Sequence, residues 1–319
     1  MSNHRFIEID DEVREQVSSP NLDSKEMEYC VLSPQNELRQ IVATNANLTD
    51  LFVSWMVKDI DPFVRAALAK NPSIKPSYIE LLSKDDNLLV ISAASENPNL
   101  TANCLYELSK HRSYIVRTGV AANPNTNEEI LESLSRDSEW GVRRSVAANP
   151  STSIKLLDIL SKDEVSEIHV AVAANPKTSM SILDFLWNSS SVARDNVLKN
   201  SNCTDDFLLK VLQNALLPRE DQDETWSDEI RGDTNSRELI AERTKLSRQL
   251  IEILIDDPSY YVRRKLAANT SLNESDLSKL ALDANEEVRQ AVVNNPNTSS
   301  ESKAAATLLG LPSKESNNE

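Results

Sequence analysis

The sequence predicts an all-α fold in which about eleven 26-residue repeats, each with two helices, stack into one solenoid. Three observations carry this prediction. Asn-Pro pairs recur at a fixed step of 26 residues, a period typical of arrays of short helical units. Apolar residues come in pairs three positions apart, as on one face of a helix, and alanine-rich runs follow them. Glycine is scarce, with 4 in 319 residues, which disfavours the many tight turns of a β-sandwich.

One asparagine marks each repeat, and we call it the anchor asparagine. The step is 26 residues from Asn45 to Asn175 and shortens to 25 at Asn200, and Ser19-Pro20 forms a degenerate first copy. Asn tolerates the left-handed backbone that ends many helices, and the proline that usually follows disfavours a helical conformation. We therefore expect each anchor to end the second helix of its repeat. The column contains Asn45, Asn71, Asn97, Asn123, Asn149, Asn175, Asn200, Arg243, Asn269 and Asn295.

Two helices per repeat follow from the columns between the anchors. The residues eight and eleven after the anchor are apolar, as in Leu157 and Leu160, and predict a first helix. Thr126 with Glu129 forms a capping-box pattern, so its column is expected to cap that helix. A run of the type Val-Arg-x-x-Val-Ala-Ala predicts a second helix. An aspartate column twelve before the next anchor is expected to cap this second helix: Asp59, Asp85, Asp137, Asp163, Asp257 and Asp283. Neither helix is long enough to be stable alone, so stacking must stabilise both.

The string VRRSVAANPSTSIKLLDILSKD at 142–163 resembles the leucine-rich repeat variant family, which is similar in general style to HEAT repeats. The resemblance covers roughly residues 12–309. It implies a right-handed superhelix in which an α-helix alternates with a shorter helix that is 3₁₀ in places. Ala46, Ser201, Thr244 and Thr270 stand where the pattern has proline, and Arg243 stands where it has the anchor asparagine, so uniform curvature is in doubt.

Composition favours a soluble, cytoplasmic protein. The apolar stretches are too short to span a bilayer, and the N-terminus is polar rather than built like a signal peptide. Three widely spaced cysteines fit neither a disulfide framework nor a metal cage, which favours a reducing compartment. The net charge of −16 repels phosphate backbones unless basic residues are segregated on one face.

The repeats divide the chain into five segments. Residues 1–11 are a polar N-terminal segment, and residues 12–217 and 237–311 are two blocks of one solenoid. Residues 218–236 are an acidic insertion, and residues 312–319 are expected to be a disordered tail. The insertion is interpreted either as a solvated loop or as a docking loop anchored by Trp226. A calcium loop is rejected, because Trp226 stands where the turn glycine belongs and the bidentate glutamate is missing.

An arginine six residues before the anchor forms the most regular charged column, which we call the arginine ladder. One interpretation makes it a surface for phosphates or an acidic partner. The other pairs each arginine with an aspartate or a carbonyl of a neighbouring repeat, and we favour it because nearly every repeat carries the residue. Ile91 and His169 are exceptions in the column. The ladder comprises Arg39, Arg65, Arg117, Arg143, Arg194, Arg237, Arg263 and Arg289.

Large apolar residues stand at the start of successive second helices, where polar residues are usual. In four consecutive repeats a large apolar residue stands seventeen or eighteen positions after the anchor: Phe63 at the eighteenth position, and Leu88, Tyr114 and Trp140 at the seventeenth. Because equivalent positions line up along a solenoid, we expect a contiguous apolar stripe, which is typical of an interaction surface. The alternative is that these side chains fold over the ridge between repeats and serve only packing.

Catalytic residues are not evident. His111 falls in the aspartate column and His169 in the arginine column, Cys104 falls beside an apolar helix face, and no metal or cofactor motif is present. The sequence thus favours a non-enzymatic scaffold that binds another protein, with nucleic acid an unlikely partner. Two alternatives stay open. One is nucleic-acid binding in a groove lined by the arginines with Arg144, Arg264 and Lys265. The other is self-association through the stripe, since the sequence leaves the oligomeric state unknown.

Overall fold

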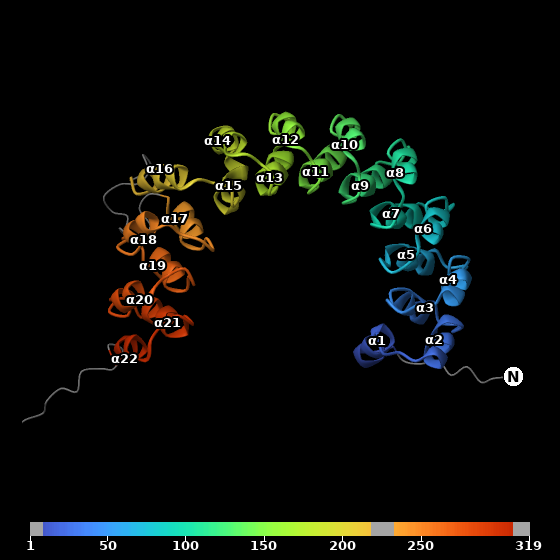
Figure 1. Ribbon diagram of the computed structural model, residues 1–319, viewed down its shortest axis with the longest axis horizontal. Coiled ribbons are helices and arrows are strands. Elements are labelled where there is room, and N and C mark those ends of the chain that lie inside the picture. Colours follow the sequence, from blue (N-terminus) through green and yellow to red (C-terminus); the bar gives the residue numbers. More distant parts are fainter. Residues whose placement is uncertain (1–8, 218–232, 309–319) are drawn as a thin grey trace, which may run out of the picture. The chain divides into compact units, whose positions relative to one another are not determined.

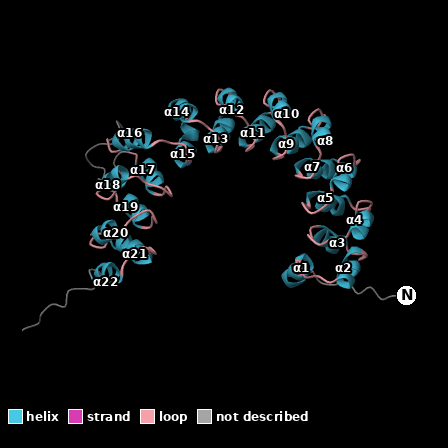
Figure 2. Ribbon diagram, in the orientation of Figure 1, coloured by secondary structure: helices cyan, strands magenta, loops and turns pink. Residues whose placement is uncertain are grey.

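A computed structural model describes residues 9–217 and 233–308, and within these ranges it contains helices and loops but no strand (Figures 1 and 2). The all-α prediction is confirmed, and the helices alternate in two sets as the repeat pattern requires. The even-numbered helices correspond to the first helix of each repeat: α2 (Ser24–Val31), α4 (Asp50–Met56), α6 (Pro76–Leu82), α8 (Ala102–Leu108), α10 (Glu128–Leu134), α12 (Ile154–Leu160), α14 (Met180–Ser189), α16 (Asp205–Ala215), α18 (Arg248–Leu254), α20 (Glu274–Leu280) and α22 (Ser300–Leu308).

The odd-numbered helices correspond to the second helix. A 3₁₀ turn at Ser191–Ala193 directly precedes one of them. They are α1 (Asp11–Ser18), α3 (Asn36–Ala43), α5 (Pro62–Lys70), α7 (Leu88–Glu96), α9 (Tyr114–Ala122), α11 (Trp140–Ala148), α13 (Ser166–Ala174), α15 (Arg194–Lys199), α17 (Thr234–Ala241), α19 (Tyr260–Ala267) and α21 (Glu286–Asn294).

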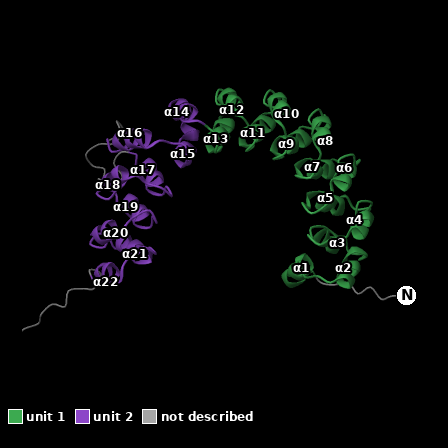
Figure 3. Cartoon of the chain, in the orientation of Figure 1, with its two compact units in different colours: residues 1–178 green, residues 179–319 purple. Residues whose placement is uncertain are grey.

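The chain divides into two compact units, residues 1–178 and 179–319 (Figure 3). In the first unit α3, α5, α7, α9, α11 and α13 pack side by side as one layer, and the even-numbered helices pack on them as a second layer. In the second unit α15, α17, α19 and α21 form the corresponding layer. The handedness and the repeat number stay predictions.

The core lies between the two layers and consists of the predicted apolar columns. Leu131 and Leu134 of α10 are buried, as are Leu157 and Leu160 of α12. Valines of the odd-numbered helices, such as Val142 and Val146, meet them from the other layer. Burial of a leucine side chain stabilises by about 2 kcal/mol, and each repeat contributes the same few positions, so stability accumulates along the stack.

The anchors end the second helices as expected, since Asn71 and Asn149 are the C-cap residues of α5 and α11. Two finer expectations, on the backbone conformation of the anchors and on helix length, are wrong. The anchors are extended and not left-handed, with φ −70° and ψ 116° at Asn71 and φ −68° and ψ 128° at Asn149. The asparagine is therefore not selected for backbone conformation. In the first unit the second helix is also not the shorter one, since α5 and α11 have 9 residues and α10 and α12 have 7. In the second unit α15 with 6 residues and α17 with 8 are shorter than α14 with 10 and α16 with 11. The small residues of the second helix let neighbouring α-helices pack along their whole length.

The threonine column does not cap the first helix. Asn127 caps α10, where its side chain accepts a hydrogen bond from the Ile130 amide at 3.0 Å. Thr126 is buried one position earlier, and its hydroxyl donates to the Val120 carbonyl at 2.6 Å. The hydroxyl thus satisfies a carbonyl that the end of the preceding helix leaves without an intrahelical partner. The same bond recurs at Thr152, Thr178 and Thr298.

The aspartate column does not cap the second helix either. Asp137 precedes the N-cap residue Glu139 by two positions and accepts a hydrogen bond from its amide at 2.9 Å. This local bond forms an Asx turn that fixes the loop between the two helices. It leaves the rest of the carboxylate available to a neighbouring repeat.

A close approach of α7 and α9 depends on Gly119. A Cβ at this position would lie 2.0 Å from the Ser95 Oγ and 3.2 Å from the Ser95 Cβ. Ser95 stands in a column that is alanine in neighbouring repeats, at Ala69, Ala121 and Ala147. The glycine therefore makes room for a side chain that is larger than usual in the facing helix.

We expect Gly119→Ala to lower the free energy of unfolding by about 1–2 kcal/mol, because overpacking outweighs the better helix propensity of alanine. In Ser95→Ala/Gly119→Ala the 2.0 Å clash with the Ser95 Oγ is removed and the 3.2 Å contact with the Cβ is kept, so the double variant should regain most of the stability lost in Gly119→Ala. Urea unfolding of the four proteins gives the coupling energy. Additive effects of the two changes would show that the contact does not explain the glycine.

Candidate interaction surface

The anchor asparagines form a column of buried hydrogen bonds between repeats. The Nδ2 of Asn149 donates to the carbonyls of Ala121 and Asn123 at 2.7 and 2.9 Å, and its Oδ1 accepts from the Ser151 amide at 2.7 Å. The two carbonyls lie 28 and 26 residues earlier, at the end of the second helix of the preceding repeat. Sequence reasoning missed this role, although the recurrence of an amide side chain at one position in nine repeats is a signal that could have indicated it. The same pair of donated bonds occurs at Asn45, Asn71, Asn97, Asn123, Asn175, Asn269 and Asn295.

Arg243 takes the place of the anchor asparagine after the insertion. Its Nη1 donates to the carbonyls of Leu198 and Asn200, the second at 3.0 Å. These are the carbonyls that an anchor would reach if the inserted residues were removed. The longer side chain therefore preserves the contact between repeats across the insertion.

Six of the eight ladder arginines pair with the aspartate 20 residues later, in the loop of the next repeat. Arg143 donates to both oxygens of Asp163, at 2.7 and 3.0 Å, and also to the carbonyl of Asp137 at 2.8 Å. Arg39, Arg65, Arg117, Arg143 and Arg263 each join their own loop to the next one by a bidentate ion pair, whereas Arg237 bonds Asp257 through its Nε and the Ala215 carbonyl through its Nη1. This is the pairing with a neighbouring aspartate that the sequence favoured. The six pairs are Arg39–Asp59, Arg65–Asp85, Arg117–Asp137, Arg143–Asp163, Arg237–Asp257 and Arg263–Asp283.

The remaining two ladder arginines lack this aspartate. Arg194 donates to the Trp187 carbonyl at 3.0 Å and lies over the Trp187 ring. Arg289 donates to the carbonyls of Asp283 and Ala284 at 2.8 and 3.0 Å. Both therefore bind backbone within their own repeat.

The internal histidines reproduce parts of this network. His111 stands in the aspartate column, and its Nδ1 accepts a hydrogen bond from the Ser113 amide at 3.1 Å, as the aspartates do. The arginine position 20 residues before it is Ile91, so both members of that ion pair are replaced together. His169 stands in the arginine column, and its Nε2 lies 2.7 Å from the Asp163 carbonyl. The two histidines are thus parts of the repeat framework.

The pKa values of three ladder aspartates, Asp85, Asp137 and Asp163, lie below their usual range, whereas burial outweighs Arg237 at Asp257 and raises the pKa of that carboxyl. Burial raises the pKa of the Asp137 carboxyl, but hydrogen bonds from Arg117 and the Glu139 amide outweigh burial and hold that pKa below its usual range. The pKa values of Asp85 and Asp163 are lowered in the same way by Arg65 and Arg143. The charges of these arginines and aspartates are therefore already paired with each other within the protein.

The three cysteines are free and buried. Burial raises the pKa of the Cys30 and Cys203 thiols to about 11, which leaves little of the reactive thiolate at neutral pH. The Cys203 thiol donates to the Val197 carbonyl at 2.9 Å and so takes the position of the column threonines. Cys104 is buried in α8, as the sequence predicted.

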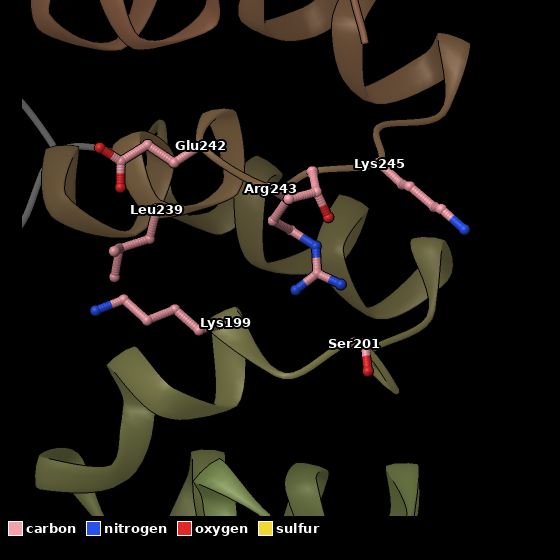
Figure 4. Close-up of a pocket in the computed structure, with 7 residues that line it drawn as sticks. Lys199, Ser201, Leu239, Glu242, Arg243 and Lys245 are labelled. Atoms are coloured by element: carbon pink, nitrogen blue, oxygen red, sulfur yellow. The ribbon is translucent and has the colours of Figure 1, made fainter. Parts of the chain in front are cut away.

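A cavity of about 280 Å³ adjoins Arg243 in the second unit (Figure 4). Lys199, Ser201, Leu239, Glu242, Thr244 and Lys245 complete its lining. Figure 4 shows the Arg243 side chain reaching toward the segment that carries Lys199 and Ser201, while the Lys245 ammonium points away. Glu242 forms an ion pair with Lys265. Because Arg243 is committed to two carbonyls, we attribute this cavity to the altered junction between repeats.

The predicted apolar stripe is exposed. Phe63, Leu88, Tyr114 and Trp140 expose 58%, 41%, 51% and 48% of their surface. They stand in the first turns of α5, α7, α9 and α11, which are neighbours in one layer. Leu89 and Ile115 are exposed beside them, at 42% and 43%. Four neighbouring helices of one layer thus each expose a large apolar side chain in their first turn. Trp226, the other predicted anchor, lies outside the described residues.

The even-numbered layer also exposes apolar side chains that sequence reasoning missed. Trp55, Leu81, Ile159 and Phe185 stand ten residues after their anchors and are exposed. The recurrence of large apolar residues at this position of the repeat could have revealed them in the sequence. Their column is interrupted by Glu107 and Ser133 in the repeats between, so it does not place one on each of four neighbouring helices as the stripe does.

Two layers of alternating helices, in repeats that buried asparagines join to one another, define a helical-repeat protein. Among the solved structures that match the chain is one described as a leucine-rich repeat variant with a novel repetitive protein structural motif. It is 18% identical, the match covers 79% of this chain and 88% of that chain, and the TM-score is 0.39. The chain is thus similar to a leucine-rich repeat variant, as the sequence pattern predicted. No family model and no curated protein matches it.

None of the helices over 9–217 and 233–308 is long and apolar enough to cross a membrane. The same part of the chain contains no group of three or more His, Cys, Asp and Glu side chains placed to hold a metal ion.

Proposed function

We propose that this chain is a non-catalytic scaffold that binds another protein through the apolar stripe of Phe63, Leu88, Tyr114 and Trp140. The observation that carries the proposal is the exposure of a large side chain in the first turn of the second helix in four consecutive repeats. The core of the repeat does not need them, since the positions beneath, such as Val116 and Val142, are already buried. Aromatic residues are enriched at the centres of protein interfaces, where they supply much of the binding energy.

The alternative function, binding of nucleic acid along the arginines, has less support. Six ladder arginines are held by aspartates, Arg264 pairs with Glu287 at 2.6 Å, and Lys265 pairs with Glu242. A phosphate would have to compete with these carboxylates. Arg144 is exposed, but one cation in an acidic chain supplies little affinity for a phosphate backbone.

The test compares the wild type with Tyr114→Ala/Trp140→Ala in affinity capture from native lysate, followed by binding of the purified captured partner. Each truncation should cost about 2 kcal/mol of binding, so the partner should be lost. Trp55→Ala/Tyr106→Ala removes the same two residue types from exposed positions of the even-numbered layer and should retain it. Far-UV circular dichroism confirms that both variants are folded. A partner that the stripe variant binds as tightly as the wild type would contradict the proposal.

A further inference from the structure

The junction at Arg243 is wider than the junctions that the anchor asparagines form. The Arg243 Nη1 reaches the carbonyls of Leu198 and Asn200 from the end of a longer side chain than asparagine has. The loop after α17 is therefore held farther from the preceding repeat, and the cavity of about 280 Å³ lies between them. Figure 4 shows Arg243 reaching across this space toward the segment that carries Lys199 and Ser201.

The exchange of asparagine for arginine also removes a hydrogen-bond acceptor from this junction. Every anchor asparagine accepts at its Oδ1 from the amide two residues later, as Asn149 does from Ser151 at 2.7 Å. Arginine has no acceptor atom in its side chain, so the Lys245 amide has no such partner among the described residues. The Leu246 amide likewise lacks a bond to the Arg243 carbonyl, although the corresponding bond follows every asparagine anchor. Two backbone donors are therefore unused in the loop that lines the cavity.

The side chains that line the cavity add further unused donors. The Nη2 of Arg243 donates to no group within residues 9–217 and 233–308, and its Nε is buried without a hydrogen-bond partner. Lys199 forms no ion pair in the same part of the chain, and the hydroxyls of Ser201 and Thr244 make no hydrogen bond there. Donors on both sides of the cavity are thus available to an acceptor that the protein itself does not supply.

Positive charge exceeds negative charge in the lining of the cavity. Lys199, Arg243 and Lys245 stand against Glu242, whose charge is already paired with Lys265. The other charged residues of segments 194–217 and 233–248 do not line the cavity, and when they are included Lys and Arg still outnumber Asp and Glu. These others are the cations Arg194, Lys210, Arg237 and Arg248 and the carboxylates Asp195, Asp205, Asp206, Asp233 and Glu238.

We propose that this cavity binds a phosphate group, either free or esterified to a small molecule. One phosphate oxygen accepts from the Lys245 amide and so replaces the Oδ1 of the missing asparagine, while the others accept from the Arg243 Nη2 and the Lys199 ammonium. A phosphate monoester carries about −1.5 to −2 charge at pH 7 and three acceptor oxygens, so it matches these donors better than a carboxylate does. The volume suits a small ligand, since ligand pockets begin at about 300 Å³. The site is independent of the apolar stripe.

The test titrates the full chain with inorganic phosphate, glycerol 3-phosphate and acetate at constant ionic strength, by isothermal titration calorimetry. Both phosphates should saturate one site, and acetate should bind at least about tenfold more weakly. The tighter of the two phosphates shows whether the free ion or an ester is the ligand. Lys199→Ala should weaken phosphate binding about fivefold or more, because it removes a charged donor. Lys210→Ala removes an exposed lysine of α16 that does not line the cavity, and should leave binding unchanged.

Arg243→Lys provides a second variant, which keeps the positive charge but loses the paired amino groups of the guanidinium. It should bind phosphate about tenfold more weakly, and urea unfolding confirms that it is folded. The proposal is overturned if neither phosphate binds saturably, if acetate binds as tightly, if Arg243→Lys binds undiminished, or if Lys199→Ala and Lys210→Ala have equal effects. Tyr114→Ala/Trp140→Ala should bind phosphate like the wild type, so this result and the scaffold proposal are judged separately.

Discussion

Replacing Arg237 by methionine is expected to lower the free energy of unfolding by about 3–5 kcal/mol. The side chains of Arg237 and Asp257 are both 0% exposed, and the Arg237 Nε donates to the Asp257 Oδ2 at 2.9 Å. Arg237 also donates to the Ala215 carbonyl at 2.8 Å, across the insertion. Methionine fills much of the volume but leaves a buried carboxylate without its countercharge, which is the costly event.

Arg143→Met is the matched control, because Arg143 and Asp163 make the same pair with side chains 12% and 11% exposed. Water can partly solvate Asp163 when the arginine is removed, so the loss should be smaller, about 1–2 kcal/mol. In Arg237→Met/Asp257→Leu no charge stays buried, and we expect part of the stability to return. Urea unfolding measures all four proteins. An equal loss of unfolding free energy in the two single variants would show that burial of the ion pair does not determine how much each ladder arginine contributes to stability.

Asn149→Ala is expected to cost about 3 kcal/mol, the second largest effect. The change removes two bonds donated to buried carbonyls of the preceding repeat and one accepted from the Ser151 amide. Each buried group left without a partner costs about 1–3 kcal/mol. Asn149→Asp should be worse still at neutral pH, because it turns a carboxylate toward the same two carbonyls.

Asn125→Ala provides the control for the anchor. Asn125 lies two residues after an anchor and donates to the Pro98 carbonyl at 2.6 Å, but it is exposed and water can replace the bond. Its loss should be below about 1 kcal/mol. Hydrogen exchange locates the damage: amides of α9 and α11 should exchange faster in Asn149→Ala, while those of α3 keep their protection. Uniform loss of protection along the first unit would contradict a contact that acts between neighbouring repeats.

The sequence by itself determined the two-helix unit, the buried apolar columns and the positions of the exposed stripe. It did so because every repeat places equivalent residues in equivalent surroundings, and ten copies average out the ambiguity of any one. Leu131 and Leu157 could be assigned to the core because the same column is apolar throughout. Tyr114 and Trp140 could be singled out because the repeat does not require them.

Only the tertiary structure decided what the polar columns do. The anchor asparagine looked like a helix terminator and Thr126 like a cap, because local sequence reveals only local partners. Their actual partners differ in reach: Thr126 bonds a carbonyl 6 residues back, Arg143 an aspartate 20 residues ahead, and Asn149 carbonyls 26 and 28 residues back. The inter-repeat bonds exist only once one repeat is stacked on the next. The stacking also separates the stripe of the odd-numbered layer from the interrupted apolar column of the other, because exposure is a property of the assembled layers and not of the chain.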